Sequence, residues 1–463
     1  MSDHDRPEAN VQAGDGAASR QLGLPVQRFW ALDRRDVAIV TLVAALFVLT
    51  GVLQNWVLAL TILNMAIISA IMALGVNIQW GYAGLFNVGT MGFVALGGLA
   101  AVLVSMPPVT AAWQAGGSRI LLGLALFVGG IFGAVLLWNR LRGRRVRGLA
   151  VAGMLVAALF AGRAVLDPGV AAVESVDPAS TGYLGGLGWS VLLSWPVGGL
   201  LAAVAAWVIG KVALGLRSDY LAIATLGISE IIIAVLKNED WLTRGVKDVT
   251  GLPRPVPTEV DLQADPAFVG LAQQVGADPL VASIVAVKLA YAFLFLLLLL
   301  GLLWLSQCAL RSPWGRMMRA IRDNEEAAGA MGKDVSGRHL QAFVLGSAVC
   351  GIAGAMMTTL DGQLTPGTYQ PLRFTFLVWV MVVVGGSGNN IGSVVGGFLI
   401  WFCWVQVEPL GLWLMSVLTA GLPEGSTLRA HLLESAAHMR LLTMGAILLL
   451  VLRFSPRGLI PER

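Results

Sequence analysis

Charged residues are scarce in this chain of 463 residues. Lys, Arg, Asp and Glu together make up 13% of it, apolar residues make up 57%, and the mean hydropathy is +0.77. A soluble protein of this length would bury a large core but would carry more charge on its surface. The shortage of charge therefore excludes a soluble globular protein and indicates an integral membrane protein.

Cysteine and histidine are also rare, which bears on chemistry. The three cysteines, Cys308, Cys350 and Cys403, lie in or beside apolar runs without the spacing of metal ligands, and the four histidines form no cluster with acids. A disulfide framework, a metal site and an enzyme are therefore disfavoured, and we expect the cysteines to pack between helices. The ATP-binding pattern G-x-x-x-x-G-K-[ST] is absent too, so we expect no cofactor in this chain.

Long apolar runs recur along the whole chain. Each is close to the twenty or so residues that a helix needs to cross a hydrocarbon layer roughly 30 Å thick. We predict an all-α polytopic fold with about 10–12 membrane segments, because the runs at 219–236, 374–387 and 440–453 are short enough to be re-entrant. The predicted spans lie near residues 37–56, 58–78, 85–105, 119–139, 148–166, 187–210, 219–236, 282–307, 340–359, 374–387, 391–409 and 440–453.

The loops between these runs predict the orientation. The net charge of +4 would suggest nucleic acid as a partner of a soluble chain, but here the basic residues lie in short loops, so membrane topology explains them better. With a cytoplasmic N-terminus, "RLRGRRVR" (Arg140 to Arg147), residues 311–338 and the C-terminal tail all lie inside. The predicted outer loop 237–280 has four basic and seven acidic residues. We therefore divide the chain into a disordered cytoplasmic arm (1–36), a transmembrane domain (37–456) and a cytoplasmic tail (457–463).

The predicted inner loop 311–338 concentrates the charge, with six basic and four acidic residues. Ser312 and Pro313 are a helix-start pair, Asp323 and Glu326 have capping-box spacing, and Gly332 suits a C-terminal cap. We predict two short helices, near 313–322 and 324–331. They could lie on the lipid surface or dock on a soluble partner, and the mixed signs of charge favour a protein. The first helix carries apolar side chains on one side: Trp314, Met317, Met318 and Ile321.

Polar residues within the spans mark a candidate translocation pathway. In "NIQWGYAGLFNVGTMG", Asn77, Gln79, Tyr82 and Asn87 stand among glycines at the junction of two spans. They either line a passage for a zwitterion or hydrogen-bond between helices, and the sequence leaves both open.

Two further features belong to the same question. Glu230 is an acid well inside a predicted span, so it is either a functional carboxylate or a structural partner of Lys237. Gly385 and Gly386 open "GGSGNNIGSVVGG", which we expect to be a cytoplasmic turn or a re-entrant tip and not a phosphate-binding loop.

Four segments carry a resemblance to a known family. "EAAGAMG" (Glu326 to Gly332) is similar to the first half of the EAA-x-x-x-G loop by which permease subunits of ABC importers contact their ATPases. "ALGVNIQWGYAGLFNVGTMGFVALGG", "LRSDYLAIATLGISEII", "SPWGRMMRAIRDNEEAAGAMG" and "VVGGSGNNIGSVVGGFLI" resemble successive blocks of the branched-chain amino acid ABC importer permeases. The resemblance is to the longer of the two permease types and covers most of the chain. It departs from that pattern at residues 107–185, a predicted insertion with two extra spans, and in the long N-terminal arm.

The resemblance implies a fold similar to type II importer permeases and a subunit of an ATP-driven importer in the bacterial inner membrane, with both termini cytoplasmic. The substrate would be a branched-chain or related amino acid. Urea or a short amide is the alternative, and a gradient-driven secondary transporter is a rival of another class. The implied partners are a sister permease in a heterodimer, two cytoplasmic ATPases that bind ATP and Mg, and an external solute-binding protein. The residues expected to couple to the ATPases are Pro313, Met317, Arg319, Ile321, Arg322, Glu325, Glu326, Ala327, Ala328 and Gly332.

Overall fold

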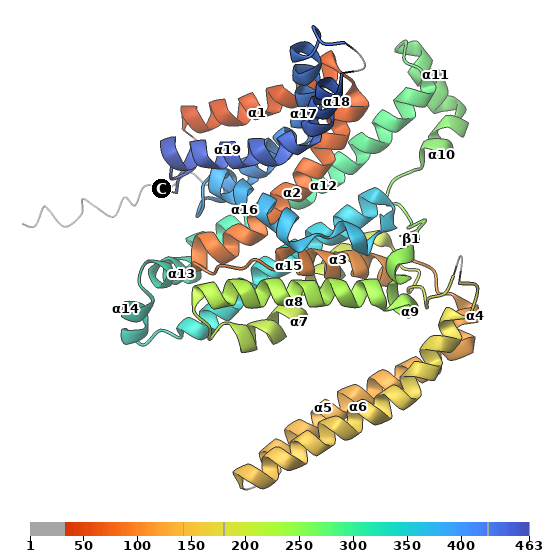
Figure 1. Ribbon diagram of the computed structural model, residues 1–463, viewed down its shortest axis with the longest axis vertical. Coiled ribbons are helices and arrows are strands. Elements are labelled where there is room, and N and C mark those ends of the chain that lie inside the picture. Colours follow the sequence, from red (N-terminus) through yellow and green to blue (C-terminus); the bar gives the residue numbers. More distant parts are fainter. Residues whose placement is uncertain (1–32, 142, 179–180, 424–425, 463) are drawn as a thin grey trace, which may run out of the picture.

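A bundle of long helices forms the body of the protein, as a computed structural model shows for residues 33–141, 143–178, 181–423 and 426–462 (Figure 1). Each of the predicted spans corresponds to one apolar helix. These helices are α1 (Arg34–Leu53), α2 (Trp56–Ala83), α3 (Thr90–Ser105), α5 (Ser118–Arg140), α6 (Arg144–Glu174), α7 (Val191–Ala213), α8 (Ser218–Asn238), α12 (Pro279–Arg311), α15 (Val335–Asp361), α16 (Pro371–Gly385), α17 (Asn390–Leu418) and α19 (Met439–Phe454).

Length separates full crossings from partial ones. Among the described residues, nine helical segments are long and apolar enough to span a membrane, and α19 adds a tenth if it is taken together with the short α18 (Thr427–Ser435). The remaining two apolar helices, α3 and α16, are shorter. The prediction that 219–236 is short was wrong, because α8 extends to Asn238. The expected helix at 85–105 begins only at Thr90, after a non-helical stretch.

The predicted N-terminal arm largely lies outside the described residues, which begin at Asp33. Its last three residues were assigned wrongly, since α1 already begins at Arg34. Asp33 caps this helix and forms a capping box with Asp36, so the first charged turn belongs to the helix rather than to the arm.

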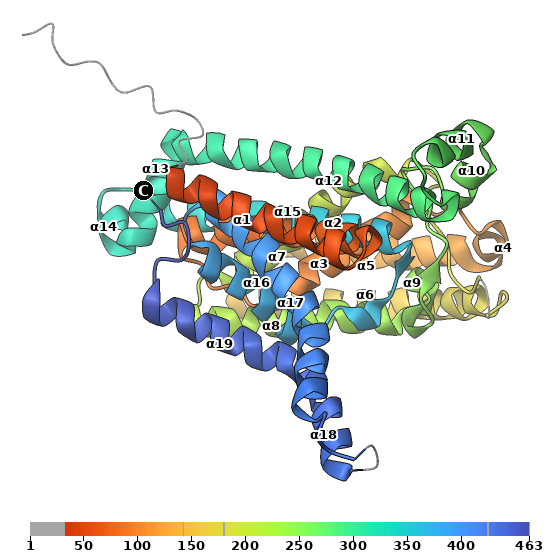
Figure 2. The same cartoon turned by 90° about the horizontal axis from the view of Figure 1, so that it is seen from above.

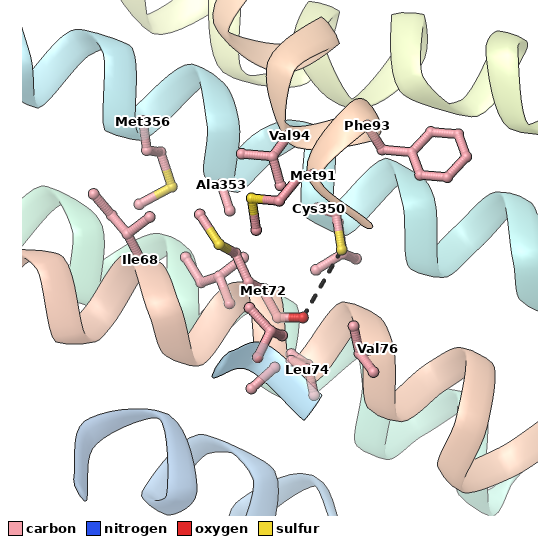
Figure 3. Packing of buried hydrophobic residues seen from close by; sticks show 14 of the residues in the cluster. Ile68, Met72, Leu74, Val76, Met91, Phe93, Val94, Cys350, Ala353 and Met356 are labelled. Carbon is pink, nitrogen blue, oxygen red and sulfur yellow. Dashed lines mark hydrogen bonds between the residues drawn. The ribbon is translucent and has the colours of Figure 1, made fainter. Parts of the chain in front are cut away.

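The centre of the bundle is formed by α2, α3 and α15, with α7, α12, α16 and α17 around them (Figure 1). Apolar side chains from α2, α3 and α15 interdigitate there, and the Cys350 thiol lies 3.8 Å from the Met72 carbonyl oxygen (Figure 3). Cys350 is thus a helix-packing residue, as we expected. Small residues bring the backbones together: a Cβ on Gly97 would overlap the Gly351 carbonyl, and one on Gly354 would overlap the Val94 carbonyl.

Helices α5 and α6 form a hairpin that leaves the bundle at an angle (Figure 1). They pack mainly against each other. At the base of the hairpin are the short α4 (Thr110–Ala112) and the π-helical turn η1 (Trp113–Gly117). The two ends of the predicted insertion lie side by side, because Pro108 and Gly185 form a bridge and the Val109 amide donates to the Leu184 carbonyl at 3.1 Å. The hairpin therefore starts and ends at neighbouring points of the bundle, while its origin as an insertion stays a prediction.

The two ends of the bundle differ in their loops (Figures 1 and 2). One end has α13 (Pro313–Asp323), α14 (Glu325–Ala330) and the described C-terminus. The opposite end has the predicted outer loop, whose strand β1 (Val249–Thr250) pairs antiparallel with β2 (Gln363–Leu364) after α15. The other short elements are α9 (Asp240–Thr243), η2 (Gly245–Lys247), α10 (Glu259–Ala264), α11 (Pro266–Gln274), η3 (Pro366–Thr368) and η4 (Ala436–His438).

Close packing at the bundle centre yields a stability prediction. We expect Gly354→Ala to lower the free energy of unfolding by about 1–3 kcal/mol, because the new methyl group would overlap the Val94 backbone. Gly301→Ala in α12 is the matched control: its Cβ would meet no neighbour, so helix propensity should stabilise this variant by roughly 0.5–1 kcal/mol. Thermal unfolding in detergent measures both. Equal melting temperatures for the two variants would show that this contact does not limit stability.

Candidate functional site

The loop between α12 and α15 folds into the two predicted helices. The Ser312 hydroxyl accepts from the Gly315 amide at 3.4 Å, which caps α13, and Gly332 adopts the left-handed conformation (φ +74°) after α14. The predicted capping box of Asp323 and Glu326 was wrong. Asn324 is the cap instead, and its side-chain oxygen accepts from the Ala327 amide at 2.9 Å. The chain is extended at Asn324, so the turn comes one residue later than predicted.

Helices α13 and α14 and the start of α15 enclose a groove of about 620 Å³. Four of the predicted coupling residues line it: Pro313, Met317, Ala327 and Ala328. Ala327 is exposed, whereas Ala328 is buried at the bottom of the groove. The remaining lining residues are mostly apolar or basic, with one amide: Trp314, Ala320, Asn324, Met331, Lys333 and Arg338. The groove is therefore an apolar surface with a basic rim, and we name it the α13–α14 groove.

The other predicted coupling residues lie outside the groove. We had expected Ile321 to contact the ATPases, but it is 1% exposed and packs inward, so that prediction was wrong. Its role is to hold α13 against the bundle. Glu325 and Glu326 are exposed on α14, and Arg319 is half-buried on α13.

Arg322 ties the end of α13 to the bundle. Its Nη1 donates to the Gly81 carbonyl oxygen at 2.5 Å and to Glu462 Oε2 at 2.7 Å, and its Nε donates to Asp323 Oδ1 at 3.3 Å. Burial lowers the pKa of this guanidinium, but the hydrogen bonds and charges of Glu462 and Asp323 outweigh burial and raise the pKa overall. The predicted coupling helix is thus joined directly to the last turn of α2 and to the C-terminal tail.

The C-terminal tail closes over the glycine-rich turn between α16 and α17. The Leu459 and Ile460 amides donate to the Val384 and Gly385 carbonyls, each at 2.9 Å. Gly386 has φ +123°, and a Cβ on it would overlap the tail backbone. Gly385 and Gly386 therefore belong to a turn at the end of the bundle that carries α13.

The amides predicted to line a pathway are buried and bonded within the chain. Gln79 Nε2 donates to the Phe343 carbonyl at 2.9 Å and to Ser347 at 3.0 Å, which joins α2 to α15. Asn77 Nδ2 donates to Asn390 Oδ1 at 3.1 Å, and the Tyr82 hydroxyl donates to the same oxygen, which joins α2 to α17. Of the two explanations that the sequence left open, the bonding supports hydrogen bonding between helices.

The same network seals the break between α2 and α3. Asn87 lies in the non-helical stretch and is 1% exposed, yet its Nδ2 donates to Gln79 Oε1 at 2.9 Å and its Oδ1 accepts from the Gly89 amide at 2.9 Å. The Val88 amide donates to the Thr225 hydroxyl at 3.1 Å, and Trp379 Nε1 donates to the Asn87 carbonyl at 3.0 Å. Side chains of α8 and α16 thus form hydrogen bonds with backbone groups of this non-helical stretch. In a continuous helix these groups would have bonded to each other.

Glu230 stands apart from this network. It lies on the exposed face of α8, and within the described part of the chain no ion pair joins it to Lys237. The exposed side chains on this face of α8 include Tyr220 and Ile223, at 64% and 70%. A structural Glu230–Lys237 pair, one of the two explanations, is therefore not formed.

A cavity that the sequence did not indicate lies between α2, α3, α15, α16 and α17. It has a volume of about 90 Å³. No local pattern pointed to it, because its residues are mostly apolar, come from five helices and a loop, and are ordinary core residues when taken singly. The lining is rich in methionine: Met65, Ser69, Met72, Met91, Met357, Thr368, Tyr369, Phe374, Leu377, Val378, Met381 and Trp401.

A membrane-spanning helical bundle with a buried helix break and a charged two-helix loop at one end has the architecture of a membrane transport protein. Comparison with known proteins agrees: residues 148–452 match the family model described as "Branched-chain amino acid transport system / permease component". The chain belongs to this permease family. No solved structure matches it.

Individual relatives fall within two substrate classes. The high-affinity branched-chain amino acid transport permease LivM of Escherichia coli is 27% identical over 63% of this chain and 62% of its own length. A probable LivM of Methanocaldococcus jannaschii is 30% identical over 33% of this chain and 41% of its own. The xylose transport permease XylH of Escherichia coli is 25% identical over 49% and 46%. The chain thus spans less than two thirds of the length of each of these relatives.

The tie between Arg322 and Glu462 gives a second prediction. We expect Glu462→Gln to lower the free energy of unfolding by about 1–2 kcal/mol and to speed hydrogen exchange in α13, because a neutral amide binds the guanidinium less tightly than a carboxylate does. Glu326→Gln is the control, since Glu326 is exposed on α14 and forms no ion pair among the described residues. Mass-spectrometric hydrogen exchange measures both variants. Identical exchange in α13 would mean that the tail does not hold this helix.

Proposed function

We propose that the chain is the permease subunit of an ATP-driven importer that moves branched-chain or related amino acids across the bacterial inner membrane by alternating access. The observation that carries the proposal is the α13–α14 groove, an apolar recess with a basic rim at one end of the bundle. A groove of this kind fits an apolar helix or loop of a soluble partner. That partner would be an ATPase, which binds ATP and Mg, with α13 and α14 on the cytoplasmic side.

The contacts of Arg322 explain how movement in the groove would reach the membrane. A force on α13 passes through its guanidinium to the Gly81 carbonyl at the end of α2. Helix α2 carries Asn77 and Gln79, whose bonds reach α15 and α17. Because packed helices move as rigid elements, a shift of α13 would tilt α2 against its neighbours rather than dissipate in a flexible loop.

The exposed face of α8 indicates where a sister permease would sit. A carboxylate in the middle of a spanning helix is costly against lipid and normally faces protein or water. Glu230 is on the outer face of α8 and not in the bundle. We therefore place this face toward the sister permease, where the two subunits would enclose a water-filled passage.

The apolar cavity supports an aliphatic substrate. Its methionines offer flexible, polarisable surface that suits a branched side chain better than the hydroxyl groups of a sugar. This agrees with the similarity to LivM proteins, whereas the similarity to XylH is lower in identity and coverage. An external binding protein would deliver the amino acid at the opposite end of the bundle, where α10 and α11 lie (Figure 2).

The proposed ATPase contact is tested with two alanines of the same helix. Ala327 lines the groove and Ala330 does not, and both are exposed on α14. We expect Ala327→Glu to weaken binding of the ATPases at least about tenfold, because it places a charge in an apolar contact, and Ala330→Glu to leave binding nearly unchanged. Co-purification and ATPase stimulation measure the effect. Equal loss, or no loss, in both variants would contradict docking in the groove.

Transport itself distinguishes the proposal from a self-sufficient transporter. We expect ATP-dependent uptake of labelled leucine by proteoliposomes that contain this chain, its sister permease, the ATPases and the binding protein. Isoleucine and valine should compete for uptake, whereas xylose and urea should not. The chain alone should show no uptake under an ion gradient; if it does, a secondary transporter that uses Glu230 is the better explanation. If urea competes for uptake and valine does not, short amides are the substrate class instead of branched-chain amino acids.

A further inference from the structure

The tip of the α5–α6 hairpin is a concentration of positive charge without a counter-charge among the residues that the structure describes. Residues 140–147 contain five arginines, and the sequence has no Asp or Glu between residues 37 and 166. Arg140 and Arg145 are exposed, and no described carboxylate lies within ion-pair distance of either, or of Arg147. No described part of this chain therefore balances these charges.

The surroundings of the tip identify the membrane as the source of that balance. The flanks of the hairpin expose large apolar side chains, with Val128, Phe132 and Phe160 at 67%, 64% and 71%. In a chain that spans the membrane, these flanks contact lipid tails. Helix α5 has 23 residues, roughly 34 Å, which is enough to bring its last turn from one surface of the hydrocarbon layer to the other. The arginines then lie at the level of the lipid headgroups.

Trp138 and Arg147 give the tip a defined shape. The guanidinium of Arg147 lies 3.9 Å from the centroid of the Trp138 ring, and its Nε is buried without a hydrogen-bond partner. Tryptophan is enriched at membrane interfaces, and stacking on it fixes a guanidinium while leaving its outer N–H groups available. A planar guanidinium of this kind suits a phosphate, which it binds with two parallel hydrogen bonds.

We propose that Arg140, Arg145 and Arg147 bind the phosphate of an anionic phospholipid. A zwitterionic lipid brings its own ammonium group beside the phosphate and would leave the arginines unbalanced, whereas an anionic headgroup balances them. A soluble protein that docks on α13 and α14 would not reach these arginines, because the tip lies away from both helices (Figure 1). The site is independent of the transport function and needs only that the hairpin lie in the membrane.

Retention of lipid by the purified full chain tests the proposal. The chain is equilibrated with equal amounts of phosphatidylglycerol and phosphatidylethanolamine and examined by native mass spectrometry. We expect the triple variant R140Q/R145Q/R147Q to retain at least threefold less phosphatidylglycerol than the parent, with phosphatidylethanolamine unchanged. The triple variant R140K/R145K/R147K keeps the charge that orients the hairpin and should retain an intermediate amount. Equal retention of phosphatidylglycerol by the glutamine variant and the parent would overturn the proposal.

Two controls locate the site and identify its ligand. Arg163→Gln removes a basic residue nearer the opposite end of α6, where Arg163 pairs with Asp167, and should leave retention unchanged. A loss as large as that of the triple variant would show general charge attraction rather than a site at the tip. Inorganic phosphate at millimolar concentration should not displace the lipid, and displacement would assign the site to free phosphate. If the triple glutamine variant fails to insert, Arg145→Gln alone should still lower retention measurably, and unchanged retention would overturn the proposal.

Discussion

Backbone groups that are not in a helix must find partners inside a membrane, and this constraint shapes the centre of the bundle. Between Ala83 and Thr90 the chain leaves one helix and enters the next without forming a tight solvent-exposed loop. Asn87 is buried there, so side chains supply the bonds that water would otherwise make. Asn87, Thr225 and Trp379 do so from three elements. The position of α8 and α16 relative to α2 follows from this requirement.

Backbone groups left free at a helix end also connect α13 with α2 and the C-terminal tail. The last turn of α2 leaves the Gly81 carbonyl available, and Arg322 of α13 binds it. Glu462 binds the same guanidinium, while the tail backbone pairs with Val384 and Gly385. One cation thus holds together a surface helix, a spanning helix and the chain end. A bond of this kind transmits displacement, because breaking it would leave a half-buried charge without its partner.

The sequence predicted the helices well and their contacts poorly, for physical reasons. Span positions depend on apolar length and helix starts depend on local caps, so Pro313 was placed correctly as the first residue of α13. Burial depends on partners far away in the chain. The apolar side of α13, which contains Ile321, was predicted to face a partner. The sequence alone does not show whether such a side packs against a partner or against the protein's own bundle. The sequence did not indicate a role for Glu462, because its ion pair depends on Arg322, which is 140 residues away in the chain.

The burial of the amides changes where a passage must be sought. Asn77, Gln79 and Asn87 are already bonded, so a substrate could reach them only by breaking bonds that hold the helices together. A passage that opens and closes repeatedly is better lined by side chains that form no hydrogen bonds between helices, because no such bond then breaks when the substrate enters or leaves. The outer face of α8, which we propose lies toward the sister permease, meets this condition, since it exposes Glu230 and a Cβ on Gly227 would meet no other described residue of this chain. In this proposal one chain supplies one wall, and the need for a second wall would be a physical reason for a second permease subunit.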